Sequence, residues 1–329
     1  MARSDAALNA ILAQLAAARH EPSTAESLAL LRKVLTGRSW HAIAKAAEIA
    51  AEYELAVLVP ELAAGFRRLL VQPLRSDPGC GGKAAIANAL YRIGAPERDI
   101  YLTGIRHVQL EPVWGGKVDT ATGLRGTCAL ALVRMQYPDY LAELADLLAD
   151  REAPARKMAA QALGYSENPA AVPLLRFKAL IGDEDPQVLT ECLLAVLQIA
   201  PHTAIDFVAQ FLDRSESAEA AALALGASRR HEALALLTAW WERTFDAALR
   251  RSALLAIAML KHDDAIAYLL AHIAESAPPH ARAALDALAV YRHDARLRAQ
   301  VDAAVAGRGE AALRRAFDEA FGPAGTAHD

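Results

Sequence analysis

The chain has 329 residues, of which 54% are hydrophobic and 6% aromatic, a composition that favours close-packed helices over sheets. A formal net charge of −4 excludes the overall basic character of many nucleic-acid-binding proteins. No apolar run approaches the roughly 20 residues of a membrane span. Three widely spaced cysteines without a CxxC pair are typical of a reducing compartment, so we expect a soluble, cytoplasmic protein.

The N-terminal segment predicts two helical hairpins. Residues 4–19 have leucines and an isoleucine on one helical stripe, and Ser23-Thr24-Ala25-Glu26 has the pattern of a capping box that starts a second helix. Ser39 is expected to cap a third helix, and Pro60 lies in the first turn of a fourth. We therefore expect residues 1–75 to form an irregular N-terminal helical cap.

The next helices begin after a break in the chain at Asp77-Pro78-Gly79. Residues 80–93 predict a helix that Gly94 ends, because glycine suits the left-handed position at a helix C-terminus. A partner helix is expected to open at Pro96.

A repeat is visible in the C-terminal part of the chain. The second helix of each pair begins with a small or polar residue and then an aliphatic one, and the aliphatic residues are 31, 33, 29, 32 and 31 positions apart: Leu141, Val172, Ile205, Leu234, Ile266 and Leu297. Two short helices in a period of about 30 residues predict an α-solenoid. We expect an all-α superhelix with a repeat array over residues 76–321 and a disordered tail at 322–329.

One segment, residues 104–120, departs from the repeat. Ile100 and Leu141 are 41 residues apart, one period plus about ten, so the surplus matches this segment. It contains Pro112, paired glycines and a tryptophan but few serines, and we expect an ordered, irregular insert. Asp119 or Thr120 is expected to cap the helix that follows.

Two repeat units resemble HEAT repeats, particularly the short type grouped with phycobilisome-lyase-like HEAT proteins: PARKMAAQALGYSENPAAVPLLRFKALIGDEDPQV and LRRSALLAIAMLKHDDAIAYLLAHI. The resemblance covers residues 78–307. It implies scaffolding and partner binding without supplying a site, because the repeat defines a fold and not a reaction. A lyase-like enzyme is an alternative implied by the same resemblance. A DNA-glycosylase-like HEAT enzyme is another, and it would need a basic concave face with an aromatic residue near a flipped base.

A single His231-Glu232 dipeptide is similar to the pairs that HEAT-fold deoxyhypusine hydroxylases repeat to hold two irons. A di-iron centre needs several converging ligands, so one pair does not predict that activity, and we expect no metal and no cofactor. His231 is expected to be a surface residue in the first turn of a helix, where Glu232 favours the positive helix end.

Charge is unevenly distributed along the chain. Residues 65–135 hold ten Lys and Arg against five Asp and Glu, whereas residues 136–329 hold nineteen against twenty-seven. The basic middle offers an alternative function, the binding of an anionic ligand or nucleic acid. At its start, Lys83 follows two glycines at a predicted helix N-terminus, which attracts anions. Cys80 there either has a lowered pKa or is simply a buried small residue.

The candidate binding residues gather in and around the insert: Lys83, Arg106, His107, Gln109, Glu111, Trp114, Lys117, Asp119 and Arg125. In an extended strip, His107, Gln109 and Glu111 would share one face. These polar groups either fold the insert against the solenoid or line a binding pocket. We predict a non-catalytic scaffold that binds a protein or peptide on its concave face, with the 104–126 insert shaping the site.

Overall fold

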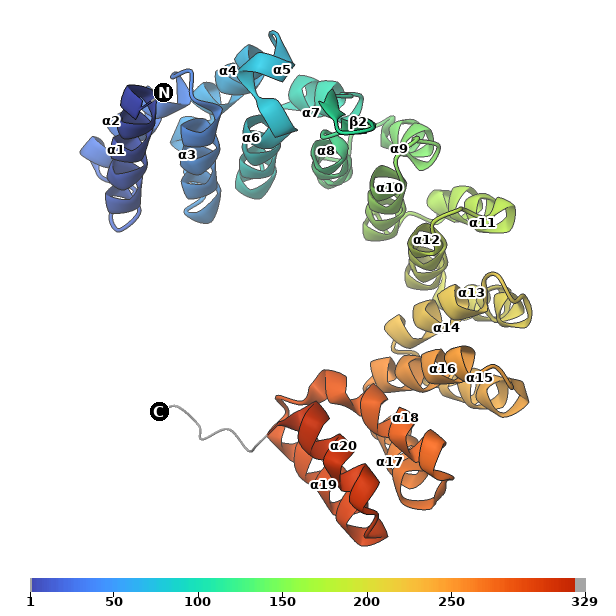
Figure 1. Cartoon of the computed structure of the whole chain (residues 1–329). Coiled ribbons are helices and arrows are strands. Elements are labelled where there is room, and N and C mark those ends of the chain that lie inside the picture. Colours follow the sequence, from blue (N-terminus) through green and yellow to red (C-terminus); the bar gives the residue numbers. More distant parts are fainter. Residues whose placement is uncertain (1, 323–329) are drawn as a thin grey trace. The chain divides into compact units, whose positions relative to one another are not determined.

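The computed structural model describes residues 2–322, which form twenty α-helices, five short 3-10 helices and one two-stranded sheet (Figure 1). The prediction of an all-α, helical-repeat fold is confirmed. The chain divides into two compact units, Met1–Ala171 and Val172–Asp329. Among the described helices, none combines the length and the hydropathy that a membrane crossing requires.

The first unit contains α1 (Ala2–Ala18), α2 (Ala25–Leu35), α3 (Trp40–Glu52), η1 (Ala56–Leu58), α4 (Val59–Leu69), α5 (Pro73–Ser76), η2 (Pro78–Cys80), α6 (Gly81–Ile93), α7 (Arg98–Ile105), β1 (Leu110–Val113), β2 (Gly116–Asp119), α8 (Thr122–Arg134), α9 (Tyr140–Leu148), α10 (Ala153–Tyr165) and η3 (Pro169–Ala171). The second unit contains α11 (Val172–Ile181), α12 (Pro186–Ile199), α13 (Pro201–Ala209), η4 (Gln210–Asp213), α14 (Ala218–Ala227), α15 (His231–Arg243), α16 (Ala247–Leu260), α17 (Asp263–Glu275), α18 (Pro278–Leu288), η5 (Ala289–Tyr291), α19 (Ala295–Arg308) and α20 (Ala311–Phe321).

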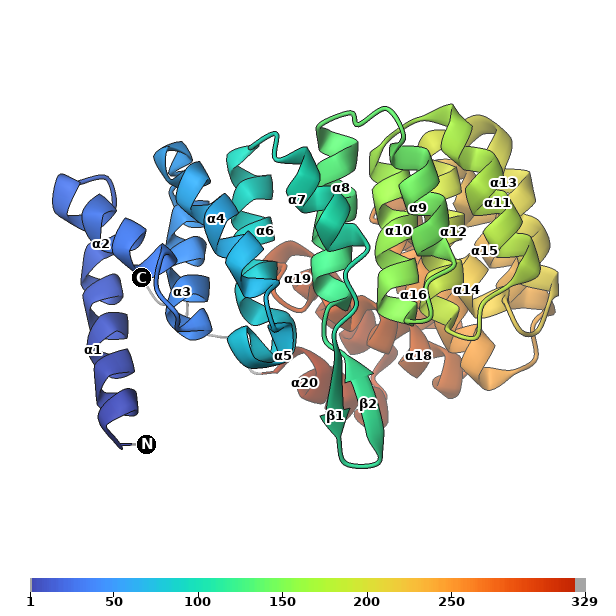
Figure 2. The same cartoon turned by 90° about the horizontal axis from the view of Figure 1, so that it is seen from above.

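In the first unit, α3, α6, α8 and α10 pack one on the next as a row, and α4, α7 and α9 pack against that row (Figure 2). Helix α4 shows why the sequence produces this arrangement. It buries Leu62, Phe66 and Leu69, whose spacing of four and three residues forms one apolar stripe. Because α3 packs directly on α6, the N-terminal helices join the row of repeats, and the predicted boundary at residue 75 stays a prediction.

The second unit has the same plan. Helices α12, α14, α16 and α18 form its row, and α11, α15 and α17 pair with their neighbours in it. The backbones of α14 and α16 approach closely at Gly226, where an added Cβ would lie 2.4 Å from the carbonyl oxygen of Ala256. The small residues of α14 therefore set the spacing between successive repeats.

Two helix starts differ from the predicted ones. The side chain of Thr24, not that of Ser23, accepts a hydrogen bond from the first turn of α2, so the predicted capping box is wrong. Neither Asp119 nor Thr120 is the N-cap of α8, a position that Ala121 takes without a side-chain bond. The Asp119 carboxylate instead binds groups of the insert, as described below.

The insert predicted at 104–120 is ordered, and its centre is a β-hairpin. Strands β1 and β2 project past the ends of α6 and α8 (Figure 2). The tail predicted for residues 322–329 lies outside the described residues, except for Gly322.

Candidate functional site

The tip of the hairpin is fully exposed. Val113 pairs with Gly116, so Trp114 and Gly115 form a two-residue turn, in which Gly115 has a φ of 92° that favours glycine. The Trp114 side chain is 103% exposed, and Lys117 is exposed beside it. An indole held fully in water buries nothing in this chain, and so the tip offers a large apolar contact to something else.

The base of the hairpin is held by the buried carboxylate of Asp119. Its Oδ1 accepts hydrogen bonds from the backbone N–H groups of Gln109 (3.0 Å) and Ala121 (2.9 Å), and its Oδ2 lies 2.7 Å from Nη1 of Arg125. Burial by itself would raise the pKa of the Asp119 carboxyl. These donors outweigh burial, and the pKa lies below its usual value. Asp119 therefore ties both ends of the hairpin to α8.

Arg125 extends this anchor to the next repeat. Its guanidinium, on α8, also donates to the carbonyl of His107 (2.9 Å), and its Nε lies 3.0 Å from Oδ2 of Asp150, which follows α9. The Arg125 side chain is only 2% exposed. Removing one member of such a buried group leaves a charge without a partner, which costs about 3–5 kcal/mol. The Arg125 interactions consequently fix the hairpin base within the helix stack.

Gln109 connects the hairpin to the segment before α6. Its buried Nε2 donates to the carbonyl of Asp77 (2.8 Å) and to Oε1 of Glu111 (2.6 Å). Its Oε1 lies 3.3 Å from Nε2 of His107, and since an amide oxygen can only accept, the imidazole donates. Burial lowers the pKa of His107 below its usual value, which favours the neutral ring. His107, Gln109 and Glu111 thus lie together, joined to one another.

Glu111 completes the base. Its Oε1 accepts hydrogen bonds from Gln109, from the backbone N–H of Gly79 (2.6 Å) and from the hydroxyl of Thr120 (3.0 Å). These donors lower the pKa of Glu111, and the Gln109 amide contributes most. The carboxylate is therefore ionised at neutral pH, and its Oε1 is occupied by donors of the chain.

The glycine-rich start of α6 does not present its lysine to an anion. Lys83 is fully buried, and its Nζ lies 2.9 Å from Oδ2 of Asp77. The backbone N–H of Lys83 also donates to Oδ2 of Asp77, and that of Gly82 donates to Oδ1. Burial raises the pKa of the neighbouring Cys80 thiol to about 12, so a lowered pKa there is excluded. An aspartate occupies the place that an anionic ligand would need.

Seven of the ten cations between residues 65 and 135 are bound within the chain. Their partners are Glu97 for Arg67, the Leu35 carbonyl for Arg68, Asp77 for Lys83, Asp99 for Arg98, Glu143 for Arg106, Asp119 and Asp150 for Arg125, and the Tyr91 carbonyl for Arg134. Only Arg75, Arg92 and Lys117 have no such partner among the described residues. Five of the ten cations thus pair with carboxylates, and Arg68 and Arg134 are held by backbone carbonyls, so few cations of the basic middle are free to contact a polyanion.

The structure brings six of the nine candidate residues into one bonded network, namely Lys83, His107, Gln109, Glu111, Asp119 and Arg125. Arg106 instead pairs with Glu143 of α9, and Trp114 and Lys117 lie at the exposed tip. Sequence reasoning missed the carboxylates of Asp77, Glu143 and Asp150. The Asp-Pro-Gly break marked Asp77 as a turn, whereas the other two lie in the next repeat, where no sequence pattern relates them to the insert.

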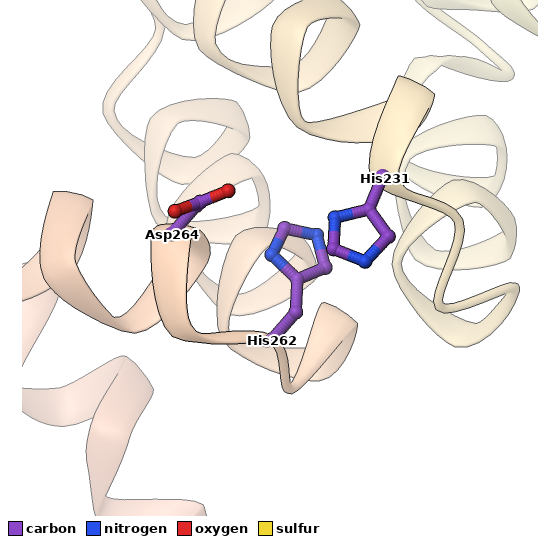
Figure 3. A group of neighbouring side chains, drawn as sticks. All are labelled: His231, His262 and Asp264. Atoms are coloured by element: carbon purple, nitrogen blue, oxygen red, sulfur yellow. The ribbon is translucent and has the colours of Figure 1, made fainter.

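A second cluster lies in the second unit (Figure 3). His231, His262 and Asp264 offer ligand atoms that all lie within 4.8 Å of one another, and His262 is the N-cap of α17. This is the one such group found among the described residues. The two imidazoles are stacked, with centroids 4.2 Å apart and planes 19° apart. An ion about 2.0 Å from a histidine nitrogen lies in the ring plane. Two nearly parallel planes share no such point, so the group is not arranged to bind a metal.

The hydrogen bond of His262 is a second argument against a metal site, because it occupies Nδ1. Its Nδ1 accepts from the backbone N–H of Ala265 (3.3 Å), which places the proton of a neutral ring on Nε2. His231 is an exposed residue at the start of α15, as predicted. A backbone N–H at that helix start lowers the pKa of Glu232, also as predicted.

The fold and the site together define a helical-repeat protein with an anchored, exposed β-hairpin. No protein-family model matches the chain, and no curated protein sequence matches it. Among solved structures, human deoxyhypusine hydroxylase in complex with glycerol matches at 20% identity over 78% of this chain and 91% of the other, with a TM-score of 0.30. The CpcE–CpcF complex of phycocyanin lyase from Nostoc sp. PCC7120 matches at 20% identity over 74% and 93%, with a TM-score of 0.37. Both are HEAT-like helical repeat proteins, and the likeness extends no further than this.

Proposed function

We propose that this chain is a non-catalytic HEAT-repeat adaptor, similar to the short phycobilisome-lyase-like repeats, that binds a protein or peptide partner through its hairpin. One observation carries the proposal: a fully exposed tryptophan lies at the tip of an arm whose base is buried and bonded to the segment before α6, to α8 and, through Arg125, to the turn after α9. Exposed loops on a rigid scaffold are where binding residues concentrate. Tryptophan is also among the residues that dominate interface energies.

The hydrogen bonds at the base favour a binding arm over a pocket. Both oxygens of Asp119, Oε1 of Glu111 and Nε2 of His107 are bonded to groups of the chain itself. The sequence analysis expected the partner on the concave face of the array. Because the hairpin extends past the helix ends, we place the contact at this end of the first unit (Figure 2). Three buried free thiols fit the cytoplasmic location expected from the sequence.

Rigid anchoring matters for affinity because association is opposed by the ordering of mobile groups. An arm already fixed by Asp119 and Arg125 loses little conformational freedom when a partner binds. The single exposed indole is then expected to act as the hot spot, with about 2 kcal/mol or more lost on its truncation.

The test is affinity capture from extracts of the native cell, followed by measurement of the dissociation constant for the captured partner. Trp114→Ala should weaken binding by about 30-fold or more. The matched control is Phe177→Ala, which removes another exposed aromatic, 64% exposed, from α11 of the second unit. Equal binding by the wild type and Trp114→Ala would contradict the proposal, as would equal losses in both variants.

A further inference from the structure

Two cations at the hairpin end of the first unit have no carboxylate partner. Arg75 is exposed on α5 and Lys117 is exposed on β2, and neither forms an ion pair or a hydrogen bond within the described chain. The third unpaired cation of the basic middle, Arg92, lies in the last turn of α6, at the opposite end of that helix from the hairpin. Two of the three cations that have neither an ion pair nor a hydrogen bond therefore lie where the arm projects, whereas Arg68 and Arg134 are held by backbone carbonyls.

Apolar side chains accompany both cations. Val71 and Leu74 are 66% and 51% exposed just before Arg75, and Val113 is 51% exposed just before Trp114. The two segments are held together, because the backbone N–H of Gly79 binds Glu111 and the carbonyl of Asp77 binds Gln109. Figure 2 shows α5 beside the base of β1. We call this set the hairpin-end surface: Val71, Leu74, Arg75, Val113, Trp114 and Lys117.

The carboxylates nearby are already occupied. Asp77 and Asp119 are buried against Lys83 and Arg125, and Glu111 accepts three hydrogen bonds from the chain. None of them forms an ion pair with Arg75 or Lys117 among the described residues. The hairpin-end surface therefore combines exposed apolar groups with two cations that form no ion pair.

We infer that the hairpin-end surface binds an acidic protein segment, in which carboxylates flank apolar side chains. The inference rests on the proposed function, because it names the chemistry of the partner for the same arm. Apolar contact around Trp114 supplies the affinity, and the charges of Arg75 and Lys117 select the sign of the partner and speed its approach. A nucleic acid is disfavoured because two cations are few beside the six or more phosphate contacts of typical binders.

The experiment selects short random peptides displayed on phage against the wild-type chain, with counter-selection on Trp114→Ala. We expect the peptides that depend on Trp114 to combine aspartate or glutamate with large apolar residues. Dependent peptides that are neutral or basic would overturn the inference and leave the proposed function intact. If no peptide depends on Trp114, both the inference and the proposed function fail.

Charge reversal in the chain, tested with the selected peptide as ligand, gives the matched comparison. Lys117→Glu and Arg92→Glu change the net charge equally, but only the first lies on the hairpin-end surface. We expect Lys117→Glu to lower the affinity for an acidic peptide by about five- to tenfold, and Arg92→Glu to lower it by less than about twofold. Affinity should also fall when the Debye length is reduced from about 30 Å to about 8 Å by added salt. Equal effects of the two variants would overturn the inference.

Discussion

Arg125 shows at the scale of single residues how the hairpin is held. Its guanidinium binds Asp119, Asp150 and the carbonyl of His107, so one side chain joins the insert, α8 and the turn after α9. A buried charge needs oppositely charged partners close by to be tolerated. The anchor is for that reason more sensitive to truncation than the exposed tip is.

We expect Arg125→Ala to lower the free energy of unfolding by about 3–5 kcal/mol, because two carboxylates lose their shared cation inside the fold. Arg92→Ala is the control, since this exposed arginine has no partner and its loss should change stability by less than about 0.5 kcal/mol. Urea titrations followed by circular dichroism measure both. Similar midpoints for the two variants would show that the buried network contributes nothing.

The imidazole of His107 gives a prediction about pH. Burial lowers its folded-state pKa below 6.5, so the unfolded chain takes up the proton first as the pH falls. Its stabilising contribution is complete above pH 6.5 and is lost as the pH falls toward the folded-state pKa. His272 in the second unit shifts in the same direction, so the comparison is with His107→Gln. The wild type should lose more stability than this variant between pH 7 and pH 5, and parallel curves would contradict the assignment.

At the scale of elements, the hairpin turn depends on one backbone conformation. Gly115 and Gly116 both have open space around the position of a Cβ, but only Gly115 has a left-handed φ. We expect Gly115→Ala to cost the hairpin about 1–2 kcal/mol and to speed amide hydrogen exchange in residues 111–118. Gly116→Ala should leave that exchange nearly unchanged. The same exchange rates in both variants would mean that the turn does not hold the strands.

The packing of α14 on α16 gives the corresponding test for the helices. Gly226→Ala forces a Cβ against the backbone of Ala256, and we expect a loss of about 1–3 kcal/mol in unfolding free energy. Gly307→Ala in α19 meets open space and should be neutral or stabilising by up to about 1 kcal/mol. Thermal unfolding compares them. A Gly226→Ala protein as stable as the wild type would show that the helices can move apart without cost.

At the scale of the whole molecule, the sequence predicted most of the fold and little of the site. The repeat was visible because helical periodicity is local: residues such as Leu62, Phe66 and Leu69 lie within two turns of one helix. The insert was visible because Pro112 and its glycines interrupt that pattern. The strand pairing was not, because the apolar alternation around it is short and exposed.

The partners of the charged residues were hidden for a different reason. Lys83 and Asp77 are six residues apart, but their pairing depends on a turn whose conformation the sequence does not specify. Arg106 and Glu143 lie in different repeats, and their pairing depends on how α7 and α9 are placed within the first unit. A motif can mark residues that have the chemistry for a site. The tertiary structure decides whether these residues are already bonded to one another within the fold.

The claim that the hairpin end is the binding surface is tested most directly by amide hydrogen exchange of the chain in the presence of the captured partner or of a peptide whose binding depends on Trp114. Amide exchange is measured across the chain with and without the ligand. We predict that binding slows exchange in residues 71–75 and 110–118, the segments that carry the hairpin-end surface. Slowed exchange confined to the helices of either unit, with no change in the hairpin, would contradict the account.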